Sequence, residues 1–162
     1  MKKTMLFLAS ILTISLFAEN TLPDLDWKIQ NGEMANWSGR VEALQDGGML
    51  LKGKNMISYC KRKYPVGDKR NVRIVYSIQG ISPRIGIYCY AANGQLLGQF
   101  QERVPNAETV QTFEAVFKLP EKIQDIEVKS FRVFFQAPFE TKIFKVEMFL
   151  ENGELKNAAD KL

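Results

Sequence analysis

The 162-residue sequence contains no histidine and only two cysteines. Without imidazole, the chain cannot build a Ser-His-Asp or Cys-His nucleophile, or any zinc site that needs a histidine ligand. Two cysteines alone cannot form a structural zinc cluster, and no glycine-rich phosphate loop is present. No pair of acidic residues stands out as the carboxylates of a glycosidase. The sequence therefore predicts a non-catalytic protein that needs no cofactor or metal.

Long apolar runs are also absent, with one exception at the N-terminus. There, Lys2 and Lys3 precede an apolar or small stretch at residues 5–18, and Glu19 follows it at once. This is the layout of a secretory signal peptide. The stretch is shorter than the roughly 20 residues of a typical membrane-spanning helix. We expect cleavage after Ala18, export to the periplasm or the extracellular space, and no transmembrane segment in the mature chain.

Charge of one sign is not in large excess. Removing residues 1–18 takes away two of the 22 basic side chains and none of the 18 acidic ones, so the net charge falls from +4 to +2. A nearly balanced surface argues against a dedicated nucleic-acid binder. No linker or internal repeat divides the remaining sequence. We expect one domain at residues 19–152, followed by a polar tail at residues 153–162.

Strand signals dominate the sequence after residue 18. Runs with alternating side chains are separated by turn formers, and no long stretch repeats apolar residues at helical spacing. These runs are RVEALQ, GMLLKG, NMISYCKRK, NVRIVYSIQ, PRIGIYCYAA, QLLGQF, VQTFEAVFKL, KSFRVFFQA and KIFKVEMFLEN. The Asn93-Gly94 pair predicts a two-residue hairpin turn in which both residues take positive φ. The sequence thus predicts an all-β sandwich of two antiparallel sheets.

Alternation of side chains assigns a core face to three of these strands. The residues expected to face the core are Phe113, Ala115, Phe117 and Leu119 in the first strand, Phe131, Val133, Phe135 and Ala137 in the second, and Phe144, Val146, Met148 and Leu150 in the third. The side chains between them are mostly polar. Each strand therefore offers one face to the core and one to solvent.

The two cysteines, Cys60 and Cys89, both lie in strand-like runs of a chain expected to be exported. In an oxidising compartment a disulfide between them would stabilise the fold by roughly 3 to 4 kcal/mol. We expect the two residues to lie on neighbouring strands or facing sheets, close enough to bridge. The alternative is a pair of buried free thiols, because cysteine packs well as a small apolar group. The sequence leaves both alternatives open.

Seven segments follow one another in a recognisable order: NGEMANWSG, GGMLLKGKN, NVRIVYSIQG, RIGIYCYAANGQLLG, FEAVFKLP, FRVFFQA and KIFKVEMFLENG. Their order resembles that of CenC-like bacterial carbohydrate-binding modules with a galactose-binding-like jelly roll. The seven segments cover nearly the whole mature chain. The resemblance implies a jelly-roll β-sandwich that binds a glycan or polysaccharide without altering it.

The resemblance also bears on metal binding. Such modules often place an acidic residue on the last strand, where it helps to hold a structural calcium ion together with an early glutamate. Here that place holds Lys145 and Val146, with only Glu147 acidic, and Glu33 lies one residue from its expected position. An ammonium group would oppose calcium binding. We therefore expect no metal.

One outward face carries side chains suited to a sugar. If Ile85, Ile87 and Cys89 face the core, the opposite face of that strand carries Arg84 and Tyr88. Aromatic rings pack on the C–H faces of sugars, and planar polar groups bond to hydroxyls. The predicted ligand-binding residues are Arg84, Tyr88, Tyr90, Arg132, Phe134 and Gln136, with Arg73 and Gln79 as a possible extension. The alternative is that the rings only cover the sheet beneath loops.

Two further features have structural interpretations. Trp37 is expected to anchor the core or a loop, whereas Trp27 fits either role. The basic segment KRKYPVGDKRNVR is expected to be a solvated hairpin tip, or alternatively to attract anionic glycans or lipid. The rival to glycan binding is a domain of the same fold that docks onto an envelope protein.

Overall fold

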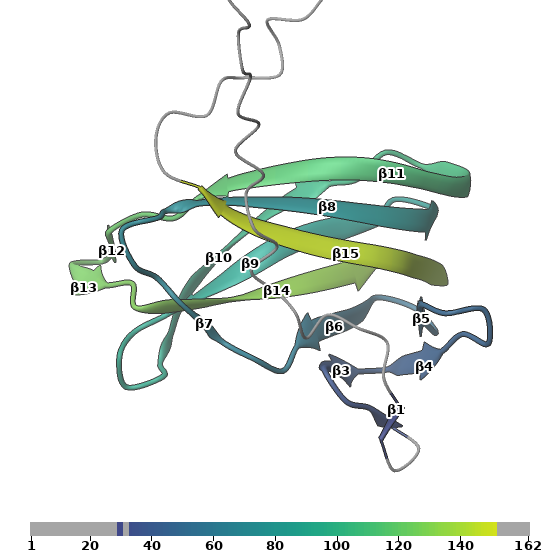
Figure 1. The fold of residues 1–162 in the computed structure, drawn as a ribbon, viewed down its shortest axis with the longest axis horizontal. Coiled ribbons are helices and arrows are strands. Elements are labelled where there is room, and N and C mark those ends of the chain that lie inside the picture. Colours follow the sequence, from purple (N-terminus) through teal and green to yellow (C-terminus); the bar gives the residue numbers. More distant parts are fainter. Residues whose placement is uncertain (1–28, 31–32, 152–162) are drawn as a thin grey trace, which may run out of the picture.

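The computed structural model describes residues 29–30 and 33–151, which form two antiparallel sheets with a core between them (Figure 1). The signal peptide expected at residues 1–18, Trp27 and the tail at residues 153–162 lie outside the described residues. Over the described ranges, no helix is long and apolar enough to cross a membrane. The predicted all-β sandwich is confirmed.

The first sheet, called sheet A here, has the spatial order β10-β9-β14-β6-β3. Its strands are β10 (Leu96–Arg103), β9 (Arg84–Tyr90), β14 (Ser130–Ala137), β6 (Met56–Cys60) and β3 (Trp37–Gly39), and the short β7 (Tyr64–Pro65) also pairs with β14. Strand β14 thus lies at the centre of sheet A. It contacts β9 on one side and both β6 and β7 on the other.

The second sheet, sheet B, has the order β11-β8-β15-β5-β4. Its strands are β11 (Ala107–Lys118), β8 (Asn71–Gly80), β15 (Thr141–Glu151), β5 (Met49–Leu51) and β4 (Val41–Ala43). Two small hairpins complete the fold, β1 (Ile29–Gln30) with β2 (Glu33–Met34) and β12 (Lys122–Ile123) with β13 (Ile126–Glu127). The long strands coincide with the runs that the sequence predicts.

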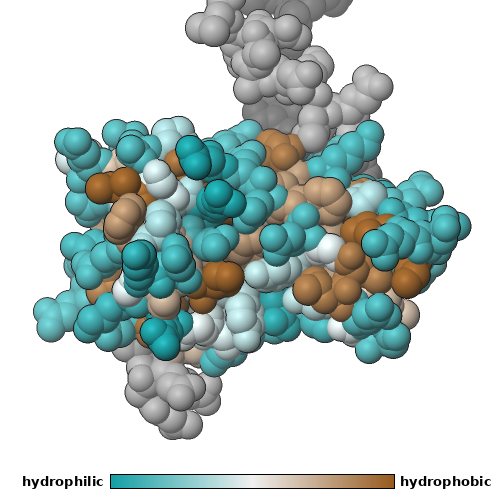
Figure 2. Space-filling model, turned by 180° about the vertical axis from the view of Figure 1, so that it is seen from behind, coloured by the Kyte–Doolittle hydropathy of each residue, from teal (hydrophilic) through white to brown (hydrophobic). Residues whose placement is uncertain are grey.

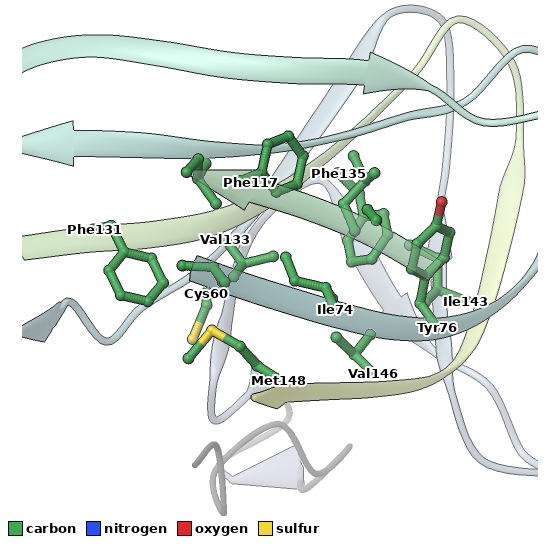
Figure 3. Close-up of a cluster of buried hydrophobic side chains, with 14 of the residues drawn as sticks. Cys60, Ile74, Tyr76, Phe117, Phe131, Val133, Phe135, Ile143, Val146 and Met148 are labelled. Carbon is green, nitrogen blue, oxygen red and sulfur yellow. The ribbon is translucent and has the colours of Figure 1, made fainter. Parts of the chain in front are cut away.

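The core lies between the sheets and draws on alternate residues of their central strands (Figure 3). Ile85 and Ile87 of β9 are fully buried, as are Phe131 and Val133 of β14. Trp37 is 1% exposed, and its ring lies 5.8 Å from that of Phe135, so the prediction that it anchors the core is confirmed. Burying each large apolar side chain contributes roughly 1.5 to 3 kcal/mol, so this layer dominates the stability of the fold.

The turn between β9 and β10 forms where expected but has a different geometry. The N–H of Gly94 donates to the carbonyl of Ala91 at 3.0 Å, and the N–H of Ala91 donates to the carbonyl of Gln95 at 2.9 Å. Gly94 has φ +84°, whereas Asn93 is not among the residues with positive φ. The prediction that both turn residues take positive φ is therefore wrong. The loop is longer than two residues, so only the glycine needs the left-handed region.

Irregularities interrupt three of the long strands. The register shifts between Leu96 and Gly98 in β10, between Ala107 and Gln111 in β11, and between Ile143 and Lys145 in β15. A bulge adds a residue and so reverses the alternation of faces beyond it. In β15 this buries Ile143 fully and leaves Phe144 half-buried. The prediction that Phe144 faces the core in step with Val146 is therefore wrong.

The basic segment after β6 is a crossover between the sheets, because β6 belongs to sheet A and β8 to sheet B. Lys61 Nζ donates to the carbonyl of Met34 at 2.9 Å, and an Arg70 guanidinium nitrogen donates to the carbonyl of Pro120 at 2.9 Å. Arg62 lies over the ring of Tyr64. The expectation of a solvated hairpin tip is therefore wrong. Several of these cations hold the crossover against the sandwich.

Both cysteines are fully buried and no disulfide joins them. Cys60 lies in β6 and Cys89 in β9, and β14 runs between these two strands. The expectation that they lie on neighbouring strands or facing sheets, close enough to bridge, is therefore wrong. The structure instead shows the alternative of two buried thiols. Burial raises the pKa of Cys89 to about 11, which keeps this thiol protonated at neutral pH.

We predict that the folded protein reacts slowly with a thiol reagent at neutral pH, because the reagent needs an accessible thiolate. After unfolding in denaturant without reductant, two thiols per chain should react at once. An absorbance assay with a chromogenic disulfide measures both stages. A denatured chain without reactive thiols would show that the cysteines are bonded.

Candidate functional site

The predicted face forms on the outer side of sheet A. Strands β9 and β14 are neighbours, and their register places Arg132 opposite Tyr88 and Gln136 opposite Arg84. Directly opposed residues in an antiparallel pair share a face. The sheet thus brings these four side chains together. Each of them is half-buried and retains surface toward solvent.

The proposed extension of this face does not belong to it. Arg73 and Gln79 lie on β8, which is part of sheet B. Arg73 forms ion pairs with Glu151 and Glu114, and its guanidinium lies 4.1 Å from the centre of the Phe149 ring. Hydrogen bonding to Glu151 is the main reason why its pKa is raised. Sequence alone could not show that β8 and β9 belong to different sheets.

Two stacked rings form the centre of the outer face. The rings of Tyr88 and Phe134 lie 4.3 Å apart with 24° between their planes. Phe134 is 1% exposed, yet it is not a member of the core cluster between the sheets. A Cβ on Gly86 would lie only 2.4 Å from Phe134 Cζ, so the ring occupies the space above this glycine. Phe134 therefore supports Tyr88 from below.

Tyr59 of β6 joins this group, although the sequence did not single it out. Its partner across the strands is Phe134, and the Arg132 guanidinium carbon lies 4.8 Å from the centre of the Tyr59 ring. Alternation along the run MISYC could have indicated it, because Tyr59 lies between Ser58 and Cys60, which are both fully buried, and so faces the other side of the sheet. What the sequence lacked was the pairing of β6 with β14.

Tyr90 also points outward, but Lys63 covers it. Lys63 Nζ lies 4.0 Å from the centre of the Tyr90 ring, and Tyr90 is only 9% exposed. Burial raises the pKa of Tyr90, and Arg132 opposes that shift. Burial also raises the pKa of Tyr88, with further contributions from Tyr90 and Tyr59. Tyr59, Tyr88 and Tyr90 thus form one cluster with Arg132.

Arg132 contains a hydrogen-bond donor without an acceptor. Its Nε is shielded from solvent and bonds to none of the described residues. The guanidinium is held between two rings, at 4.8 Å from the centre of Tyr59 and 5.6 Å from that of Tyr90. Such cation–π contacts attract the guanidinium group to the rings and so help to fix its position. Arg132 is therefore fixed in position and retains donor capacity.

A hollow of about 250 Å³ lies at one end of this face. It is lined by Arg84, Arg103 and Gln136 of the sheet and by Asn55, Ser82 and Pro138 of the adjoining loops. Arg103 pairs directly with Arg84 across the β9–β10 hairpin. The sequence analysis missed Arg103 because a bulge in β10 prevented a simple count of faces along that strand. Figure 2 shows the molecule from behind Figure 1, where hydrophobic side chains are interspersed among hydrophilic ones.

The last strand offers little for a cation. Lys145 Nζ lies 2.9 Å from Glu147 Oε2, so an ammonium group already pairs with this carboxylate. Within residues 29–30 and 33–151, no three acidic or cysteine side chains come together as a metal site.

No protein-family model and no curated protein matches the sequence. In structure, the chain is similar to the CBM22-1 xylan-binding domain of Paenibacillus barcinonensis Xyn10C, with TM-score 0.55, 9% identity, and coverage of 74% of this chain and 88% of that one. The CBM22-2 xylan-binding domain of the same protein gives TM-score 0.54, 10% identity, and coverage of 78% and 97%. These likenesses show a shared fold, the jelly roll of carbohydrate-binding modules.

The chain is also similar to part of a larger protein. The enzymatically active domain of tailspike protein 4 from bacteriophage CBA120 gives TM-score 0.52 and 10% identity, with coverage of 78% of this chain. The chain spans only 21% of that domain's length. The likeness therefore concerns one unit within the tailspike and shows the fold alone.

We predict that Gly86→Ala destabilises the protein by about 1 to 3 kcal/mol, because the added Cβ would meet the Phe134 ring and the Phe100 backbone carbonyl at 2.5 Å. Urea unfolding measures the loss, and near-ultraviolet circular dichroism reports the displaced tyrosine rings. Gly67→Ala is the matched control, since nothing lies within 4 Å of its Cβ position. Equal stability of the two variants would contradict the packing described for Phe134.

We predict that calcium does not stabilise the protein, because Lys145 already pairs with Glu147 and would compete with a cation for this carboxylate. Thermal melts with calcium and with a chelator should coincide. A ligand that binds the native state must raise the melting temperature. A clear rise with calcium would therefore show that other oxygens provide a site.

Proposed function

We propose that this protein is an exported, non-catalytic domain that binds a glycan on the outer face of sheet A. The observation that carries the proposal is the stack of Tyr88 on Phe134 beside Arg132. Tyr88 presents a ring whose position is fixed from below, and Arg132 presents donors whose direction is fixed by two neighbouring rings. A sugar needs both kinds of contact at once.

Preorganisation is the main reason to favour binding over simple coverage of the sheet. Ordering a flexible side chain on binding costs about 0.5 to 1.5 kcal/mol, and a ring already held by packing avoids this cost. The half-exposed guanidinium of Arg132 gives a second reason, since it carries several N–H donors and a sugar hydroxyl could accept from those that reach the surface. Under this proposal Tyr88, Tyr59 and Arg132 contact the glycan, while Phe134 and Tyr90 support them.

The fold and composition fit the same proposal. Structural neighbours include domains whose names state that they bind xylan, although at 9% and 10% identity they lend only their architecture. The sequence has no histidine for acid–base or nucleophilic work. Export rests on the N-terminal pattern at residues 1–18. Docking onto an envelope protein is the rival, but the hollow and the polar side chains of this face suit a hydrated ligand better than a flat apolar interface would.

The proposal predicts that soluble oligosaccharides bind the mature protein with a dissociation constant between millimolar and micromolar, about −4 to −8 kcal/mol, because the face is open. A glycan array followed by calorimetry on the best ligand measures this. Tyr88→Ala should weaken binding at least about tenfold, equivalent to about 1.4 kcal/mol, while Tyr88→Phe should retain most of it.

Phe149→Ala is the control, since this half-buried ring lies on β15 in sheet B beneath Arg73. It should leave glycan affinity unchanged. The ligand should also be recovered uncleaved after prolonged incubation. Binding that survives Tyr88→Ala but is lost in Phe149→Ala would place the site on the other sheet, and the absence of any glycan ligand would refute the proposal.

A further inference from the structure

Three polar side chains form a row across sheet A at the edge of the aromatic group. Arg103 of β10 lies opposite Arg84 of β9, and Arg84 lies opposite Gln136 of β14. All three line the hollow of about 250 Å³. Neighbouring strands are about 4.8 Å apart, so the two arginine backbones are close enough for both guanidinium groups to reach one small ligand. The register of the three strands therefore places these side chains next to one another.

The two arginines carry like charges without a counterion. Neither forms an ion pair with any other residue that the structure describes, whereas Arg73 on the opposite sheet pairs with two glutamates. Like charges directly opposite each other on a sheet are unfavourable. Glu102, next to Arg103 in β10, lies opposite Ile85 of β9, whose side chain faces the core. Its carboxylate is therefore on the other face of the sheet and does not neutralise the pair.

The loops around the hollow are held in unusual conformations. Asn55 has φ +53° and Ser82 has φ +51°, and both residues line the hollow. The N–H of Ser82 donates to Asn106 Oδ1 at 2.8 Å, and the N–H of Asn55 donates to the carbonyl of Pro138 at 3.2 Å. Positive φ is costly for a serine and is found where the surrounding structure imposes it, often at ligand sites.

From these observations we propose that the hollow binds the carboxylate of an acidic sugar, so that the protein prefers glycans containing uronic acid. This inference rests on the proposed function. The guanidinium fork matches a carboxylate in a bidentate arrangement, and the amide of Gln136 can bond to the adjoining hydroxyls. An anion between Arg84 and Arg103 also removes their mutual repulsion.

The position of the hollow relative to the rings supports a single ligand for both. Tyr88 and Arg84 are four residues apart on the same face of β9, which corresponds to roughly 13 Å along the strand. A glycan of a few units can therefore stack one sugar on Tyr88 and place a carboxylate between the arginines. In this arrangement Tyr88 contacts the ring of one sugar, and Arg84 and Arg103 select for a negative charge on another.

The test compares short oligosaccharides of galacturonic, glucuronic and mannuronic acid with the same compounds after reduction of their carboxyl groups. Calorimetry at low salt should show that at least one acid form binds about tenfold or more tightly than its reduced counterpart. The preference should shrink as salt is added, because ions screen the interaction. The Arg84→Gln/Arg103→Gln variant should lose the preference and still bind the reduced form.

Lys69→Gln/Lys118→Gln is the charge-matched control, since both lysines are exposed and neither lines the hollow. It should keep the preference. The double arginine variant should melt no lower than the parent protein, because it removes a like-charge contact. If it is unstable, the single Arg103→Gln variant, at an exposed position on the edge strand, gives a second measurement.

Equal affinity for acid and reduced forms in the parent protein would overturn this inference and leave glycan binding intact. A preference that persists in the arginine variant, or one for sulfated sugars over uronic acids, would overturn it as well. Failure of every sugar, acidic or neutral, would instead refute the proposed function itself.

Discussion

Strand β14 has to be packed on both of its faces, and the organisation of sheet A follows from this requirement. Its odd-numbered residues from Phe131 to Phe135 fill the core between the sheets, whereas Phe134 lies on the opposite side. An exposed phenylalanine at the centre of a sheet would leave a large ring in water. The side-chain-free Gly86 on one neighbour and Tyr59 on the other give this ring its place. The sandwich therefore has a second, smaller hydrophobic layer outside its core.

This outer layer separates the roles of the residues on the face. Phe134 and Tyr90 are almost completely covered, so their contribution is to fix the positions of Tyr88 and Arg132. The neighbouring side chains of Arg84 and Arg103 are not covered in this way, and they place positive charge in the hollow. One sheet thus presents a rigid aromatic surface next to a polar recess. That combination can distinguish ligands by shape and by charge independently.

Period-two alternation predicted most of the strands, because each strand places one face in the core and one in water. It identified Ile85, Ile87 and their outward neighbours correctly, and it failed at Phe144, where a bulge reverses the faces. The pairing between strands could not be predicted, because partners such as β6 and β14 are distant in sequence. Tyr59 was missed for this reason, and the placement of the two cysteines on strands separated by β14 could not be predicted for the same reason. Arg103 was missed because a bulge in β10 shifts the faces along that strand.

The bulges in β10 and β11 have a consequence for how the molecule behaves among its own copies. Both are edge strands, and an irregular, twisted edge is a poor template for strand addition by a second chain. If the proposed glycan is a long polymer, copies of the domain bound to it would reach a high local concentration. Edges that resist pairing would let neighbouring copies sit side by side on such a polymer as separate, soluble particles.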